Sequence, residues 1–209
     1  MCGIVGLFLK DDSLERDLGN LLSDMLVTMT DRGPDSAGIA IYSDKDAGKA
    51  KFTIQSENAH QDFKDLPNYL CKYLNCRVDV RINDTHAVVT LDGSSTGKFS
   101  ETLKSFNPEI RIMSQGSSLE IYKEVGFPKQ VTERFKIPHM SGRHGIGHTR
   151  MATESAVTTM GAHPFNTGLD QCLVHNGSLS NHNSLRRKLQ REGIPVSYTH
   201  LTLPTTSPV

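Results

Sequence analysis

The chain has 209 residues, of which 36% are hydrophobic and 22% charged, and 23 Lys and Arg side chains balance 23 Asp and Glu side chains. No block of one charge sign stands out, and no apolar run approaches the roughly 18 residues that span a bilayer. The composition therefore argues against a nucleic-acid partner and against a membrane partner. Four cysteines at irregular spacing argue against a disulfide framework.

The N-terminal segment predicts a strand, a helix and a second strand. Charges at 10–12 interrupt the first apolar run, so we expect no secretory signal and a cytoplasmic protein. Residues 4–9 predict a buried strand, and Asp12 with Glu15 predicts the capped start of a helix. The turn TDRGPDSAG separates this helix from a buried strand at 39–42. The helix carries an apolar stripe at helical spacing, made by Leu14, Leu18, Leu21, Leu22, Met25, Leu26 and Met29.

The middle of the chain has a different pattern. Residues 45–64 are polar and predict an exposed connection. After them, a helix and a hairpin are each predicted twice, which indicates a small α+β insertion at about residues 60–126. The predicted helices are 66–74 and 100–105, and the predicted hairpins are 77–82 with 86–91 and 110–113 with 119–122.

The C-terminal part resumes the first pattern at HGIGHTRMAT. A short strand at 172–174 leads into His175-Asn176-Gly177, and Ser180 or Asn181 caps a helix that Gly193 and Pro195 end. The last residues, 196–209, contain no Asp, Glu, Lys or Arg. We interpret 196–209 as a non-native or disordered tail.

Cys2 is the first candidate for chemistry. After removal of Met1, a cysteine there carries both a thiol and an α-amine, whose reference pKa is about 7.7–8.0. One residue then holds a nucleophile and its own general base. Gly3 leaves room for a substrate. Taken alone, such a cysteine is more often an incidental buried residue.

Two further stretches carry groups suited to acyl transfer. Arg150, among small residues, suits a bidentate clamp on a carboxylate, or equally a structural salt bridge. The Asn176 amide and the Gly177 backbone N–H suit a pair of donors to a tetrahedral oxyanion, although Asn-Gly by itself is usually only a turn.

Together these stretches resemble the class II glutamine amidotransferases, whose glutaminase domains are N-terminal-nucleophile hydrolases. The matching stretches are MCGIVGLF, DRGPDSAGIAIY, GIGHTRMATES with AHPF, and CLVHNGSLSNHNSLRRKL. They cover about residues 1–43 and 142–195 and leave the insertion uncovered. The resemblance implies an α+β fold in the form of a four-layer αββα sandwich. It assigns residues 1–195 to one amidotransferase domain, which we expect to be truncated at its C-terminus.

The resemblance also implies the roles of individual residues. Cys2 matches the nucleophile, and Asn176 and Gly177 match the oxyanion hole. Arg150, with Thr153 nearby, matches the clamp on the glutamine α-carboxylate. The implied reaction converts glutamine and water to glutamate and ammonia through a thioester on Cys2, with no cofactor in this chain. His163, in the AHPF segment that borders the glutamine pocket, is assigned with Arg150 and Thr153 to substrate binding. Arg32, beside the nucleophile, is the supporting position.

Some features depart from the family pattern. Met151 and Glu154 stand where relatives often carry Trp and His. In the family, an acidic residue in a segment after the HNG helix binds the glutamine α-amine. No such segment is recognisable after that helix here, so we expect the fragment to be poorly active. The insertion most resembles stand-alone subunits of glutamate-synthase-like systems, including N-methylglutamate synthase, in which partner subunits carry flavin and iron–sulfur chemistry. The alternatives are the N-terminal domain of an amidophosphoribosyltransferase and a non-catalytic binding protein on this scaffold.

Overall fold

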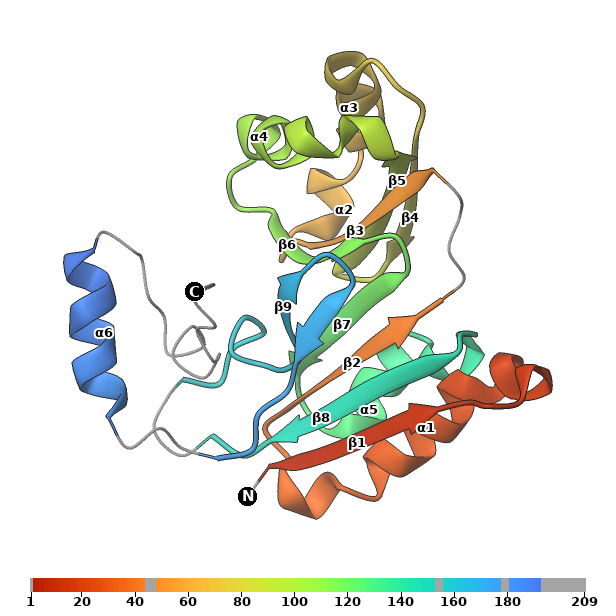
Figure 1. Cartoon of the computed structure of the whole chain (residues 1–209), viewed down its shortest axis with the longest axis vertical. Coiled ribbons are helices and arrows are strands. Elements are labelled where there is room, and N and C mark those ends of the chain that lie inside the picture. Colours follow the sequence, from red (N-terminus) through yellow and green to blue (C-terminus); the bar gives the residue numbers. More distant parts are fainter. Residues whose placement is uncertain (1, 44–47, 153–155, 178–180, 193–209) are drawn as a thin grey trace.

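The computed structural model describes residues 2–43, 48–152, 156–177 and 181–192. Its strands form two four-stranded sheets and one hairpin, all with antiparallel pairing (Figure 1). The first sheet has the order β1 (Gly3–Phe8), β8 (His144–Arg150), β2 (Ser36–Tyr42) and β7 (Leu119–Val125). The second has the order β4 (Val78–Asn83), β5 (His86–Asp92), β3 (Lys49–Gln55) and β6 (Arg111–Gly116). The hairpin pairs β9 (Phe165–Gly168) with β10 (Gln171–Leu173).

The α-helices are α1 (Leu18–Val27), α2 (Ala59–Asp62), α3 (Leu66–Leu74), α4 (Thr96–Phe106), α5 (Pro128–Arg134) and α6 (His182–Arg191). The 3₁₀ helices are η1 (Asp12–Asp17), η2 (Thr30–Arg32), η3 (Gly93–Ser95) and η4 (Ile137–His139). Helices α1 and α5 lie against the first sheet and α2, α3 and α4 against the second, whereas α6 lies apart from both (Figure 1). No helix in the described ranges is long and apolar enough to cross a bilayer.

One face of the first sheet is covered by α1 and α5 (Figure 1). Leu18, Leu22 and Leu26 are fully buried against it, whereas Leu21 and Met25 are over a third exposed. The predicted stripe is therefore too wide, because a helix on a sheet buries only the side chains that face the strands. The predicted cap is one residue late: Asp11 is extended and its carboxylate accepts from Ser13 N at 2.9 Å, which starts η1.

The second sheet has its own core beneath α3 and α4. Ala50, Phe52 and Ile54 alternate along β3 and are buried there, and the Phe52 ring stacks on Phe99 at 3.9 Å between centroids. The prediction of an exposed connection over 45–64 is wrong at β3, which lies inside the sheet between β5 and β6. Its alternate residues are polar, yet Thr53 and Gln55 among them are buried as well, since Thr53 Oγ1 accepts from the Ile121 N–H of β7 in the first sheet.

The chain crosses from one sheet to the other between β6 and β7. β6 pairs with β3, and β7 pairs with β2 in the register Ser36↔Val125 to Tyr42↔Leu119. The predicted hairpin of 110–113 with 119–122 is therefore wrong, since its two strands belong to different sheets. The second sheet corresponds to the insertion expected at about 60–126, but it also includes β3, which comes earlier in the chain, and it excludes β7. The chain is thus a mixed structure of helices and sheets, and the four-layer sandwich stays a prediction.

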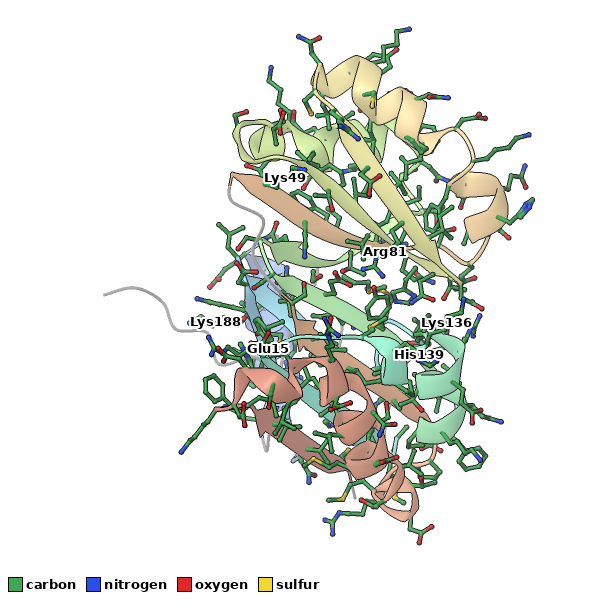
Figure 2. All side chains as sticks on the ribbon, turned by 90° about the vertical axis from the view of Figure 1, so that its right-hand side faces the viewer. Glu15, Lys49, Arg81, Lys136, His139 and Lys188 are labelled. Atoms are coloured by element: carbon green, nitrogen blue, oxygen red, sulfur yellow. The ribbon has the colours of Figure 1, made fainter. Side chains whose placement is uncertain are left out.

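Polar side chains join the two sheets where they meet. Arg81 of β4 donates to Glu120 of β7 at 2.7 Å, in the region where Figure 2 labels Arg81. His86 of β5 is fully buried, with its ring centroid 4.7 Å from that of Phe135 and 5.9 Å from that of Tyr122. The two sheets therefore share an interior that includes an uncharged imidazole, because burial lowers the pKa of His86 to about 3.

This imidazole predicts an acid-sensitive contribution to stability. As the pH falls from 7 to 5, His86 becomes protonated in the unfolded chain but not in the folded chain. The free energy of unfolding therefore decreases as the pH is lowered. With a reference pKa of about 6.5, the loss is about 2 kcal/mol from this residue. Urea unfolding of the full chain and of His86→Phe at both pH values measures it. From pH 7 to 5, we expect the free energy of unfolding to decrease by about 2 kcal/mol less in the variant than in the unsubstituted chain. Equal decreases in the two would contradict the assignment.

Candidate active site

The backbone of Cys2 is held by side chains from two distant segments. The Asn176 side-chain Nδ2 donates to the Cys2 carbonyl oxygen at 2.8 Å, and Arg32 Nε donates to the same oxygen at 3.4 Å. The Cys2 thiol, half-buried, lies 3.9 Å from the Met151 carbonyl oxygen, to which it donates. Residues near positions 2, 32, 151 and 176 therefore meet at one place, although 174 positions separate Cys2 from Asn176.

The next residue fixes the strand. Gly3 pairs with Thr149 at the end of the β1–β8 ladder, and its N–H donates to Thr149 Oγ1 at 3.2 Å. Thr149 Oγ1 in turn donates to the Met29 carbonyl oxygen at 3.3 Å. A Cβ at position 3 would lie 2.9 Å from both Met29 Cβ and Thr149 Oγ1. Glycine is thus needed here for close packing of the chain against its neighbours, in addition to the room for substrate that we expected.

The RGPDSAG segment contacts the end of β8 on the same side. The Asp35 N–H donates to the Arg150 carbonyl oxygen at 3.1 Å, and Asp35 Oδ2 accepts from Ala152 N at 2.7 Å. Arg32, at the end of η2, supplies the contact with Cys2. This segment therefore ties the residues after β8 to those around the thiol, and Asp35 is a member of the site that our sequence analysis did not single out.

Arg150, the last residue of β8, is only 6% exposed. Its Nη1 donates to the Ala156 carbonyl oxygen at 3.2 Å, which links it to the segment that follows the loop. Thr153, predicted beside it, lies outside the described residues. Gly177 follows Asn176 and is exposed. The structure thus places Cys2, Arg32, Arg150 and Asn176 around the ends of β1 and β8, while their chemical roles stay predictions.

His163 belongs to a second layer behind these groups. It is 7% exposed, and its ring stacks on that of His148 with 4.2 Å between centroids. His148 Nε2 donates to the His175 carbonyl oxygen at 3.0 Å, so it supports the residue before Asn176. Burial lowers the pKa of His148 to about 4 and holds that of His163 still lower. Both imidazoles are therefore neutral at pH 7, and His148 is another site residue that sequence reasoning missed.

Lys123 of β7 is an unexpected cation in this layer. It is 3% exposed, and its Nζ donates to the carbonyl oxygens of Ala162 and Pro164 at 2.8 and 3.2 Å, on either side of His163. Nζ also lies 4.6 Å from the centroid of the Phe165 ring. Burial lowers the pKa of Lys123 to about 7. Sequence reasoning missed this residue, because YKEV resembles an ordinary exposed strand end.

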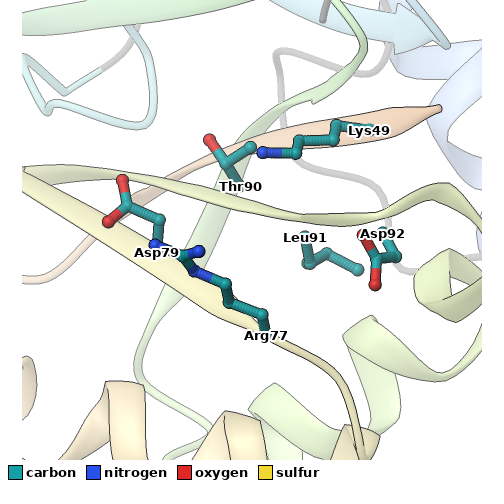
Figure 3. Close-up of a pocket in the computed structure, with 6 residues that line it drawn as sticks. All are labelled: Lys49, Arg77, Asp79, Thr90, Leu91 and Asp92. Carbon is teal, nitrogen blue, oxygen red and sulfur yellow. The ribbon is translucent and has the colours of Figure 1, made fainter. Parts of the chain in front are cut away.

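A separate hollow of about 230 Å³ lies on the second sheet. Figure 3 shows its lining, which includes two cationic and two acidic side chains and none of the predicted site residues. The lining consists of Lys49, Arg77, Asp79, Thr90, Leu91 and Asp92. In the described part of the chain, no three His, Cys, Asp or Glu side chains are grouped as metal ligands would be. The hollow therefore contributes no residue to the group around Cys2.

An anchored cysteine beside an amide donor and a buried arginine is suited to acyl transfer from an amide. No family model matches the chain. It is 62% identical over 194 residues to a glutamine amidotransferase-like protein, GlxB, of Rhizobium meliloti, covering 93% of this chain and 64% of that protein. It is 30% identical over 208 residues to a putative glutamine amidotransferase of Methanothermobacter thermautotrophicus, covering 92% of this chain and 66% of that one.

A shorter match reaches a glutamine–fructose-6-phosphate aminotransferase of Methanosarcina acetivorans, at 42% identity over 88 residues, 40% of this chain and 14% of that protein. These homologues support the assignment of this chain as a glutamine amidotransferase. The chain spans about two thirds of the length of the first two relatives, 64% and 66%.

The buried amine in the layer behind the site predicts a pH dependence of the same origin and sign as that of His86, but at higher pH. Between pH 7 and 9 the unfolded chain keeps the Lys123 proton that the folded chain releases, so the free energy of unfolding rises with pH. This contribution is about 2 kcal/mol. Urea unfolding at both pH values should show the full chain gaining that much relative to Lys123→Met. The control is Lys129→Met, at a largely exposed position, whose unfolding free energy should change with pH as in the unsubstituted chain. If Lys123→Met showed that same change with pH, the assignment would be refuted.

Proposed function

We propose that this chain hydrolyses L-glutamine to glutamate and ammonia as a class II glutamine amidotransferase with Cys2 as its nucleophile. The observation that carries the proposal is the attachment of Cys2: Asn176 and Arg32 both donate to its carbonyl oxygen, so the thiol has a fixed place next to a side-chain amide. The resemblance of the motifs and the named homologues support the same reaction.

The proposed reaction uses only groups of this chain and substrate. After Met1 is removed, the α-amine of Cys2 takes the thiol proton, and the sulfur attacks the glutamine side-chain amide carbon. The amide oxygen becomes negatively charged, and donors at Asn176 and Gly177 stabilise it. The proton then passes to the leaving nitrogen, ammonia departs, and water hydrolyses the thioester to glutamate.

Substrate recognition is proposed for Arg150 and Thr153. A guanidinium binds a carboxylate through two parallel N–H groups, which suits the glutamine α-carboxylate. The neighbouring segment, to which Nη1 of Arg150 already donates at Ala156, would then shape the pocket on that side. His163 lies one layer behind, and we assign it a supporting role because it is buried and uncharged at pH 7.

We further propose that the ammonia passes to a synthase partner of the glutamate-synthase-like type, with flavin and iron–sulfur groups in the partner and no cofactor in this chain. This part rests on the resemblance of the insertion expected at about 60–126 to stand-alone amidotransferase subunits. Purification of the full chain with proteins encoded beside it, followed by flavin and iron analysis, tests it. Neighbouring genes for purine synthesis, in place of genes for a flavin-dependent synthase, would favour the alternative that this chain is the N-terminal domain of an amidophosphoribosyltransferase.

A diazo-ketone analogue of glutamine tests the nucleophile directly. We expect it to add to the Cys2 sulfur with loss of N₂, to be blocked by excess L-glutamine, and to leave Cys2→Ala unmodified. Mass spectrometry of the Cys2 peptide is the measurement, with the Cys172 peptide as an internal control for a half-buried thiol. Absence of a Cys2 adduct in the full chain would favour a non-catalytic binding role.

Removal of the side-chain amide donor tests the oxyanion assignment. Asn176→Ala is expected to lower kcat for glutamine hydrolysis by about 10²-fold while KM changes little, because the donor acts on charge that develops in the transition state. The matched control is Asn83→Ala, whose amide donates to a backbone carbonyl at the same 2.8 Å, at Phe135. Equal losses in the two variants would show that Asn176 has only a structural effect.

A further inference from the structure

Asp170 makes a dense set of contacts that the proposed chemistry does not use. Its carboxylate accepts from the backbone N–H groups of Ser117, Ser118 and Leu119, with shortest distances of 2.9, 2.8 and 3.0 Å. The hydroxyls of Ser117 and Ser118 donate to it at 2.7 and 3.1 Å. Although burial alone would raise the pKa of Asp170, the hydrogen bonds from Ser118 and Ser117 hold it well below its usual range. The carboxylate is thus ionised in a nest of donors.

These donors lie on the crossing between the two sheets. Ser117 and Ser118 separate β6, in the second sheet, from β7, in the first. Asp170 lies in the turn between β9 and β10, has a left-handed backbone with φ 53°, and donates its own N–H to the Gln115 carbonyl oxygen at 2.9 Å. A Cβ on Gly116 would lie 2.1 Å from Asp170 Oδ1, so the approach requires glycine there. The turn and the crossing are therefore joined by a charged, closely packed contact.

The same turn leads directly to the site. β10 ends at Leu173, and Asn176, three residues later, donates to the Cys2 carbonyl oxygen. Along β10, Cys172 packs against the first sheet and lies 3.3 Å from the Tyr42 hydroxyl. His148 Nε2 then donates to the His175 carbonyl oxygen. The segment 171–176 is thus fixed at its start by Asp170, in its middle by Tyr42, and near its end by His148.

We infer that Asp170 is a positioning residue: through the Ser117–Leu119 crossing it couples the second sheet to the segment that carries Asn176. The coupling itself does not depend on the proposed function, whereas its effect on catalysis rests on that function. Loss of the carboxylate would free the start of 171–176 while leaving β1 and β8 paired. The Asn176 amide would then spend less time in place beside Cys2.

Hydrogen exchange of the full chain tests the coupling without glutamine chemistry. In Asp170→Asn, amides of 171–176 should exchange about tenfold faster or more, because the lost hydrogen bonds involve a charged acceptor, while β1 and β8 keep their rates. Ser117→Ala removes one hydroxyl donor and should give a smaller change in the same segment. The matched control is Asp84→Asn, at a turn with φ 57° and an ion pair to Arg134, which should leave 171–176 unchanged.

Labelling of Cys2 tests the consequence. In Asp170→Asn, modification by the diazo-ketone glutamine analogue should slow about tenfold, whereas alkylation of Cys2 by iodoacetamide, which needs no oxyanion donor, should stay within about twofold. Unchanged exchange at 171–176, uniformly faster exchange throughout the chain, or the same effect in Asp84→Asn would overturn the inference. If the analogue fails on the unsubstituted chain while exchange responds as expected, the proposed function fails and the coupling stands.

Discussion

The attachment of the Cys2 carbonyl oxygen is the constraint on which the site depends. A chain terminus is held on one side only, so its residues have more freedom than any others unless they are bound. Here the β1–β8 ladder fixes Gly3, and Asn176 and Arg32 fix the carbonyl just before it. The thiol therefore has a defined position although it lies next to the end of the chain.

Behind this attachment, the protein keeps buried polar groups uncharged or well supplied with partners. His148 and His163 stack as neutral rings, and Lys123 is bound by two carbonyl oxygens. Asp170, which is only partly buried, stays ionised because backbone and hydroxyl donors surround it. Burial penalises the charged form of a group unless hydrogen bonds or opposite charges offset it, so these residues differ according to their local donors.

Local patterns predicted much of the fold. The helix at 66–74 lies where the sequence placed it, and the turn expected at Asn83-Asp84 lies one residue later, at Asp84-Thr85, because both features depend on nearby spacing and turn chemistry. The predicted hairpin of 110–113 with 119–122 was wrong because two adjacent strands can pair with each other or with distant partners. Strand β3 was missed because its alternate residues are polar, and only the packing of the two sheets buries Thr53 and Gln55 among them.

For the site, the sequence by itself determined the chemical types: a thiol at Cys2, an amide at Asn176 and guanidinium groups at Arg32 and Arg150. Only the tertiary structure decided that Asn176 and Arg32 share the Cys2 carbonyl oxygen, and that Asp170, His148 and Lys123 support the segments behind them. Side-chain identity fixes which bonds a group can form, but burial and the pairing of distant strands fix which ones it does form.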